Sequence, residues 1–155
     1  MELSAILAPE RVVVDLAVAD KEALLAELGR RAGALLGMPG VAITEALENR
    51  EKLGSTGLGS GFALPHARLD GLDQFFGMFV RLARPIAFES VDDQPVSLVF
   101  LLLSPSAAPA GEHLAALAAI SRRMRDPETV QRLRSRTTAA RLFAELAGGG
   151  GKEAA

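Results

Sequence analysis

One run of residues limits the folds open to this chain more than any other part of the sequence. Val96 to Leu103 reads VSLVFLLL, with apolar side chains at both odd and even positions. A strand with this pattern is buried on both of its faces. The run is also far too short to cross a bilayer, which takes ~20 apolar residues. We therefore expect it to be the central strand of a sheet that is covered on both sides.

Shorter patterns predict the elements around this strand. Further strands are expected at Val12–Val14, Phe62–Leu64 and Phe75–Leu82, where β-favouring residues gather. Helices are expected over 20–36, 41–53 and 111–124, then a short one that starts at Asp126-Pro127 and a final one from Thr137 or Thr138 to Leu146. The order of one strand, two helices, three strands and further helices predicts the α/β (α+β) class, with a mixed sheet covered by helices on both faces.

Specific residues define the expected helix ends and faces. Asp20 is expected to cap the first helix, and the glycines around Pro39 are expected to end it. Its core-facing positions are expected to be Ala23, Leu24, Leu28 and Leu35. On the helix that starts near residue 111, the apolar stripe is expected to consist of Leu114, Leu117 and Ala118.

Length and composition exclude several classes of protein. The 155 residues correspond to one domain, expected over 1–147, and the glycine-rich segment 148–155 is expected to be a disordered tail. A net charge of −2, with phenylalanine as the only aromatic residue, argues against nucleic-acid binding. The absence of cysteine excludes disulfides and thiolate metal sites. Because the N-terminus lacks the features of an export signal, we expect a cytoplasmic protein that does not insert into membranes.

The stretch GSTGLGSGFALPHARLD, residues 54–70, has four glycines in its first eight residues and then one of the chain's two histidines, His66. Its spacing fits neither a P-loop, nor a dinucleotide-binding loop, nor a nucleophile elbow. The glycines predict either a surface hairpin or a loop whose amides, with the hydroxyls of Ser55 and Thr56, approach an anion. Pro65 would present His66 at the rim of the sheet, either as a nucleophile with one free nitrogen or as a structural histidine.

Three other residues are candidates for the same site. His113 lies near a predicted helix start, where backbone amides favour an anion, although it could simply bind water there. Arg50 ends a predicted helix and could bind a phosphoryl group or only complement the helix dipole. Arg68 could approach the same anion or face solvent. A metal site or a Ser-His hydrolase is less consistent with the sequence, because it has no metal-binding spacing and no serine in an elbow.

A basic segment lies near the C-terminus. Residues 121–141 hold seven arginines against two acidic residues, Asp126 and Glu128, for a local charge of +5. Such runs are usually solvated helix faces. A docking surface for an acidic partner is the alternative.

Three segments of the sequence are similar to those of a known family. REKLGSTGLGSGFALPHA, from Arg50 to Ala67, resembles the signature of phosphotransferase-system (PTS) EIIA domains of the fructose/mannitol type, also called type 2. HLAALAAISRRMRD, from His113, resembles the family's second histidine segment, and the sequence from Pro85 to Pro105 resembles its central strands. The resemblance covers residues 3–146 and is strongest to the nitrogen-regulatory IIA branch.

This resemblance implies a three-layer α/β/α sandwich and a role for each candidate residue. His66 corresponds to the phosphorylated histidine, His113 to a supporting histidine and Arg50 to an arginine of the same pocket. The remaining phosphate-binding groups are expected from Gly54, Ser55, Thr56, Gly57 and Arg68. Ala67 stands where many relatives have glycine, and no cofactor or metal is implied.

The resemblance also implies partners. A histidine-phosphocarrier protein would donate the phosphoryl group. Candidates for an apolar docking rim are Phe62, Leu64, Leu69 and Leu72, with core packing as the alternative for Phe62 and Leu64. The expected function is a regulatory phosphocarrier that acts on target proteins. The alternative is a sugar-specific relay that passes phosphate to a permease B component, and the sequence shows no fused permease or B domain. A third possibility is an interaction module that never carries phosphate.

Overall fold

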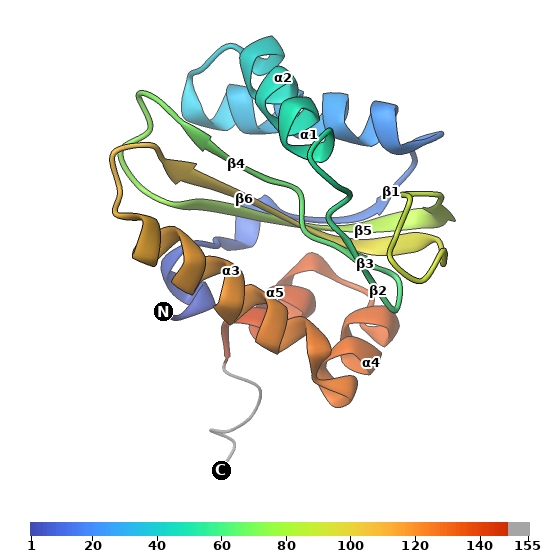
Figure 1. Ribbon diagram of the computed structural model, residues 1–155. Helices are drawn as coiled ribbons and strands as arrows, with labels where there is room; N and C mark the ends of the chain where they lie inside the picture. The colour runs from blue at the N-terminus through green and yellow to red at the C-terminus, as the bar shows by residue number, and fades with distance from the viewer. Residues whose placement is uncertain (149–155) are drawn as a thin grey trace.

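The apolar run forms β6, Val96–Pro105, at the centre of a six-stranded sheet in the computed structural model, which describes residues 1–148 (Figure 1). The sheet order is β1-β5-β6-β3-β2, and β4 pairs with β6 beyond the end of β3. β6 runs antiparallel to β5 and parallel to β3 and β4. The prediction of a mixed sheet with this run as its central strand is confirmed.

Two of the strands were not expected from the sequence. The other strands of the sheet are β1 (Val12–Leu16), β2 (Gly57–Gly59), β3 (Phe62–Ala63), β4 (His66–Leu69) and β5 (Phe76–Ile86). β2 and β4 are the additions, and β5 continues through Pro85, which the sequence suggested would follow the strand. In β4, His66 pairs with Leu102 and Arg68 pairs with Ser104. This parallel pairing fixes the place of His66 along the central strand.

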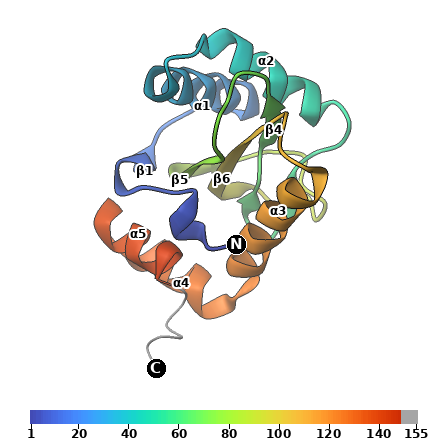
Figure 2. The same cartoon turned by 90° about the vertical axis from the view of Figure 1, so that its left-hand side faces the viewer.

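Helices cover both faces of the sheet, as Figures 1 and 2 show from two sides. One layer holds α1 (Lys21–Leu36) and α2 (Gly40–Glu51), and the other holds α3 (Ala110–Arg125), α4 (Pro127–Ser135) and α5 (Ala139–Ala147). Two 3-10 turns, Leu3–Ala5 and Pro9–Arg11, precede β1. Asp20, Asp126 and Thr138 cap their helices through side-chain oxygens, which confirms the predicted helix starts.

Side chains of β6 alternate between two cores. Val99, Leu101 and Leu103 pack with α1 and α2, whereas Leu98, Phe100 and Leu102 pack with α3, α4 and α5. All six are fully buried. The even-numbered face of β6 therefore points toward α3, which determines the side on which Ser104 also lies.

Several helix details differ from the sequence prediction. Gly40 begins α2 instead of ending α1, because Gly37 already ends α1 in the left-handed conformation. Leu35 is 52% exposed and does not face the core. A Cβ atom on Gly29 of α1 would lie 2.0 Å from the Thr44 hydroxyl of α2, so the two helices pack too closely there for a larger residue. Most of the predicted C-terminal tail, residues 149–155, lies outside the described residues.

Candidate functional site

A hollow of about 430 Å³ opens where the end of α2, the start of β4 and the start of α3 meet. It brings together four of the residues predicted for the site, from three separate segments of the chain. The hollow is lined by Ala46, Asn49, Arg50, Leu53, His66, Ala67, Arg68 and His113. The glycines and hydroxyls of residues 54–57 are not part of its lining.

His66 is held in one orientation by its own chain. Nδ1 of its ring lies 2.8 Å from the Leu64 carbonyl oxygen. Because a carbonyl only accepts hydrogen bonds, Nδ1 carries the hydrogen and Nε2 carries the lone pair. Arg50 Nε donates to that Nε2 over 3.2 Å. Burial lowers the pKa of His66 below its ordinary value, and the Arg50 charge lowers it further, against the opposing effect of the Leu64 carbonyl. His66 is therefore a neutral imidazole near pH 7.

Arg50 reaches the hollow from the last turn of α2. Its Nη1 donates to the Gly54 carbonyl over 2.9 Å, while its Nε is directed at His66. Gly54 thus contributes a carbonyl that orients the arginine. Its amide donates to the Glu51 carbonyl oxygen over 3.1 Å.

His113 faces His66 from the first turns of α3. The two ring centroids are 5.7 Å apart and the ring planes are tilted by 51°. Nδ1 of His113 lies 2.8 Å from the hydroxyl of Ser104, which is completely buried in β6. Burial is the main cause that lowers the pKa of His113, followed by the charges of His66 and Arg68. Both rings are therefore neutral near pH 7.

The buried face of α3 differs from the predicted one. Its buried residues are Ala116, Ala119, Ile120 and Met124, whereas Leu114 is 62% exposed. His113 lies three and seven positions before Ala116 and Ile120, which is the spacing of one helix face. The face that packs on the sheet therefore carries His113 toward β6. Of the predicted stripe, Leu117 packs against the core, whereas the prediction was wrong for Leu114 and Ala118, which are exposed.

Arg68 lines the hollow and also braces the loop before α3. Its Nη2 donates to the Ser106 carbonyl over 3.2 Å and to the Ala108 carbonyl. The guanidinium thereby connects β4, which carries His66, to the segment that leads to His113. Its charge is also close enough to lower the pKa of His113.

Ser55, Thr56 and Gly57 have other partners. Ser55 Oγ donates to the Phe88 carbonyl over 2.7 Å, and Gly57 N donates back to Ser55 Oγ over 3.0 Å. The amide and hydroxyl of Thr56 both donate to the carboxylate of Glu51. These contacts hold the 54–57 segment against neighbouring parts of the chain.

The glycine run forms the hairpin that was one of its two interpretations. β2 and β3 pair antiparallel, with Ser60 and Gly61 at positive φ between them. A Cβ atom on Gly57 would lie 2.5 Å from the Ser90 hydroxyl, so this glycine permits a close contact between two loops. The glycines of the run therefore allow the turn between β2 and β3 and the close contact with Ser90.

Glu51, which follows Arg50 directly, was not predicted from the sequence to support the site. Its carboxylate, 6% exposed, accepts the two hydrogen bonds from Thr56 and forms an ion pair with Lys21 at 2.9 Å. These contacts fix the end of α2 from which Arg50 extends. The adjacent Arg-Glu pair in the sequence was the available signal, because one residue can face the hollow while the other anchors the helix end.

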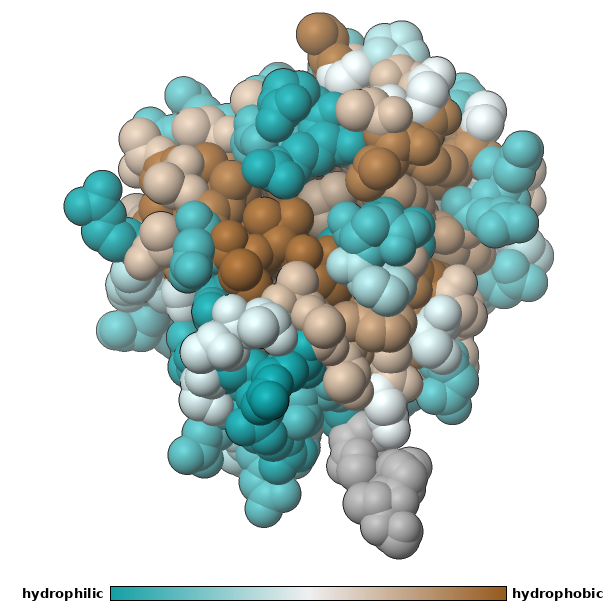
Figure 3. All heavy atoms as spheres, turned by 180° about the vertical axis from the view of Figure 1, so that it is seen from behind, coloured by the Kyte–Doolittle hydropathy of each residue, from teal (hydrophilic) through white to brown (hydrophobic). Residues whose placement is uncertain are grey.

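Three of the four candidates for an apolar docking rim are buried. Phe62 and Leu64 belong to the core, which was their alternative, and Leu69 is 8% exposed. Leu72 is partly buried and packs against the core. Leu53, at 83%, and Leu114, at 62%, are instead the exposed leucines beside the hollow and beside His113. Figure 3 shows the face of the molecule opposite to the view in Figure 1, where apolar patches alternate with hydrophilic residues.

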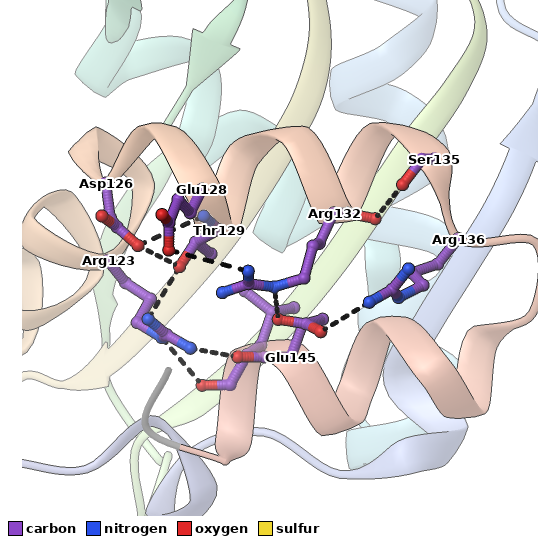
Figure 4. A network of polar contacts seen from close by, with 9 residues as sticks. Arg123, Asp126, Glu128, Thr129, Arg132, Ser135, Arg136 and Glu145 are labelled. Carbon is purple, nitrogen blue, oxygen red and sulfur yellow. Dashed lines mark hydrogen bonds and ion pairs between the residues drawn. The ribbon is translucent and has the colours of Figure 1, made fainter. Parts of the chain in front are cut away.

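The basic segment is largely engaged in contacts within the protein (Figure 4). Arg132 and Arg136 both bind the Glu145 carboxylate, at 2.7 and 3.4 Å. Arg123 donates to the hydroxyl of Thr129 and to carbonyls at the end of α5. These contacts join α3, α4 and α5, so this part of the segment is structural, whereas Arg122, Arg125 and Arg141 are exposed.

Residues 1–148 lack a metal-binding cluster and a membrane-spanning helix. In this part of the chain, no group of three or more His, Asp or Glu side chains is arranged to hold a metal ion. No helix there combines the length and the apolar character needed to cross a membrane.

The geometry defines what the hollow can do chemically. It holds a neutral imidazole with a lone pair on Nε2, a second imidazole 5.7 Å away between centroids, and the guanidinium groups of Arg50 and Arg68. A nucleophile surrounded by cationic donors is suited to attack an electrophile that carries negative charge.

Comparison with known proteins identifies the family. The model of "Phosphoenolpyruvate-dependent sugar phosphotransferase system, EIIA 2" matches residues 5–148. A nitrogen regulatory protein from Bradyrhizobium diazoefficiens is 46% identical over 147 residues, which cover 95% of each chain. The fructose-specific EIIA component from Haloferax volcanii is 34% identical over 108 residues, 68% of this chain and 70% of that protein.

Solved structures agree with this result. The crystal structure of nitrogen regulatory protein IIA-Ntr from Neisseria meningitidis matches with a TM-score of 0.88 and 36% identity, over 93% of this chain and 98% of that one. The fold expected from the resemblance is thereby confirmed. The chain belongs to the EIIA type 2 family of the phosphoenolpyruvate-dependent sugar phosphotransferase system.

Proposed function

We propose that this protein is a regulatory phosphocarrier, which accepts a phosphoryl group on Nε2 of His66 from a histidine-phosphocarrier protein. The observation that carries the proposal is the hydrogen bond from His66 Nδ1 to the Leu64 carbonyl, at 2.8 Å. It leaves Nε2 as the only nucleophilic nitrogen of a ring that lines the hollow. Membership of a phosphotransferase family supports the same chemistry.

The transfer is a displacement at phosphorus. The lone pair of His66 Nε2 forms the new N–P bond while the N–P bond of the donor phosphohistidine breaks, and its electron pair goes to the donor nitrogen. The hydrogen on Nδ1 of His66 stays in place. As the ring acquires positive charge, the Leu64 carbonyl at 2.8 Å stabilises it. The chain then has to supply only position and charge.

Arg50, Arg68 and His113 surround the place that the phosphoryl group would occupy. In the free protein, Arg50 Nε donates to His66 Nε2 over 3.2 Å. Once Nε2 is bonded to phosphorus, that donor is available to a phosphoryl oxygen. Preorganised donors of this kind stabilise the charge of the transition state without reorganisation.

The regulatory role is preferred over a sugar-specific relay because of which relatives resemble the whole chain. The protein from Bradyrhizobium diazoefficiens that matches 95% of the chain carries the name nitrogen regulatory protein. The fructose-specific relative matches only 68% of it, at lower identity. We infer that the phosphorylation state of His66 controls binding to target proteins, with phosphate transfer to a permease B component as the alternative.

Phosphorylation of purified protein tests the proposal. Incubation with phosphoenolpyruvate and the general phosphotransferase proteins is expected to add one acid-labile phosphate, measured by intact mass. His66→Ala is expected to remain unlabelled, and His113→Ala to accept phosphate but transfer it poorly. Normal labelling of His66→Ala would show that another residue is the acceptor.

A second experiment separates the regulatory role from the relay. Both phosphorylation states of the protein are immobilised, and the proteins captured from an extract of its host are compared. A regulatory protein is expected to capture different targets in its two states. Rapid transfer to a fructose or mannitol B component, with equal capture by the two states, would favour the relay. Absence of any phosphate on wild-type protein would favour an interaction module.

A further inference from the structure

Ser104 lies in β6 two residues after Leu102, on the strand face that points toward α3. It is completely buried in a strand that is otherwise apolar around it. Within residues 1–148, the one hydrogen bond of its hydroxyl is to Nδ1 of His113, at 2.8 Å. A buried hydroxyl needs such a partner, so the position of Ser104 and the orientation of the His113 ring depend on each other.

The two histidines of the hollow are anchored by chemically different groups. The Leu64 carbonyl can only accept, so it fixes the hydrogen of His66 on Nδ1. The hydroxyl of Ser104 can either donate or accept, so it is compatible with both neutral tautomers of His113. The tautomer determines whether Nε2 of His113 presents a lone pair or a hydrogen to the hollow.

Only one of the two tautomers of His113 suits an anion. If Nδ1 carries the hydrogen, Nε2 presents a lone pair, which repels a phosphoryl oxygen. If the hydroxyl of Ser104 donates to Nδ1, Nε2 carries the hydrogen and can donate to that oxygen. The ring centroids are 5.7 Å apart, so a group bonded to His66 lies within reach of His113.

We propose that Ser104 is a positioning residue for phosphoryl transfer: its hydroxyl donates to Nδ1 of His113 and so presents the Nε2 hydrogen of His113 to the phosphoryl group on His66. This inference rests on the proposed function. A backbone carbonyl in the place of Ser104 would impose the opposite tautomer, so the hydroxyl supplies something that the anchor of His66 cannot.

The tautomer can be measured directly in the unphosphorylated wild-type protein. Two-bond and three-bond ¹⁵N–¹H correlations of the two imidazole rings at pH 8 are expected to show the hydrogen on Nδ1 of His66 and on Nε2 of His113. A hydrogen on Nδ1 of His113 would overturn the inference. This readout does not depend on any phosphotransferase activity.

Variants of Ser104 test the consequence for transfer. Ser104→Ala is expected to lower the rate constant for transfer between His66 and the phosphocarrier protein by roughly 10- to 100-fold, with unchanged affinity for that protein. In the same variant, the imidazole correlations of His113 are expected to show a mixture of tautomers, while those of His66 stay the same. Ser104→Thr keeps the hydroxyl and is expected to recover most of the rate.

Ser90→Ala is the matched control. Ser90 is also a buried serine, but its hydroxyl has no hydrogen-bond partner among the described residues and it lies beside Gly57 instead of the hollow. Its replacement is expected to leave the rate and both tautomers unchanged. A normal rate in Ser104→Ala would overturn the inference, and if that variant does not fold, the wild-type tautomer decides. Failure of wild-type protein to accept any phosphate would instead overturn the proposed function.

Discussion

The two ends of β6 use neighbouring parts of one sequence motif in different ways. Near its start, Leu98 pairs with Phe62 of the glycine hairpin, and near its end, Leu102 pairs with His66. The hairpin depends on backbone conformation, with positive φ at Ser60 and Gly61. The hollow depends on side chains that converge from α2, β4 and α3. A motif that is continuous in sequence therefore contains a structural part and a chemical part.

We therefore expect substitutions in the hairpin and in the hollow to have different effects. Changes in the hairpin should lower the stability of the fold and leave the chemistry of the folded molecules intact. Changes in the hollow should slow transfer and have little effect on stability, because its polar residues are partly exposed. Three substitutions test this separation, from the largest expected effect to the smallest, and a fourth prediction concerns the effect of pH on the hollow.

Arg50→Gln is expected to slow phosphoryl transfer to His66 by roughly 100- to 1000-fold, because it removes a preorganised cationic donor beside the reacting nitrogen. The midpoint of thermal unfolding should change little. Stopped-flow transfer from the phosphorylated phosphocarrier protein measures the rate. Arg141→Gln, an exposed arginine on α5, is the control. A rate loss of less than threefold in Arg50→Gln would remove this guanidinium from the chemistry.

Gly57→Ala is expected to lower the free energy of unfolding by ~2–3 kcal/mol, because the new Cβ would lie 2.5 Å from the Ser90 hydroxyl and 2.9 Å from the Ser90 Cα. Urea unfolding measures this change, and the folded fraction should still accept phosphate at the normal rate. Gly111→Ala, whose Cβ would meet no atom within 4 Å, is the control and should be neutral or slightly stabilising. A stable Gly57→Ala that transfers slowly would contradict the separation.

Leu53→Glu is expected to raise the KM for the phosphocarrier protein by about tenfold, because it places a charge on an exposed leucine that lines the hollow. Leu58→Glu changes the exposed leucine of the hairpin and should leave KM unchanged. Steady-state transfer at varied phosphocarrier concentration measures both. Equal effects of the two substitutions would show that docking does not distinguish the two ends of β6.

The two lowered histidine pKa values predict a modest pH dependence of stability. Unfolded histidines take up protons near pH 6.5, whereas burial keeps the folded pKa of both His66 and His113 lower. The unfolded state therefore binds more protons as the pH falls below about 7, and the protein should lose stability until the folded pKa values are reached.

Thermal midpoints at pH 7.5 and 5.5 measure this loss. The double variant His66→Gln/His113→Gln should show a smaller decrease between these two pH values than the wild type. Shifted carboxyl groups do not interfere in this range, since Glu27, with a pKa of about 2, titrates well below it. An unchanged decrease in the double variant would assign the pH dependence to other groups.

Local signals in the sequence predicted much of the fold. The caps at Asp20, Asp126 and Thr138 act within three residues, and the apolar run of β6 needs no knowledge of its partners. β4 was missed because its four residues become a strand only through pairing with β6. On α3, leucines were predicted to face the core. The buried positions include Ala116 and Ala119, whose small side chains let the helix approach the sheet.

Residue types in the sequence predicted some residues of the site but not their contacts. His66, His113, Arg50 and Arg68 have side chains suited to an anion, and the structure brings them to one hollow. Ser55 and Thr56 have hydroxyls that looked equally suitable, but the Phe88 carbonyl and the Glu51 carboxylate bind them. The Phe88 carbonyl is distant in sequence, and the Glu51 side chain turns toward Thr56 only in the folded chain. The sequence pattern alone therefore could not predict these contacts.

The parallel pairing of His66 with Leu102 and of Arg68 with Ser104 has a consequence for evolution. Neighbouring positions of a strand point to opposite sides, so a slip of one residue would turn the His66 ring toward the α1–α2 core and away from α3. The pairing of β4 with β6 thus sets where His66 lies relative to Ser104, the residue that contacts His113. Loops around the opening can accumulate insertions and new partner contacts over time without moving the rings apart.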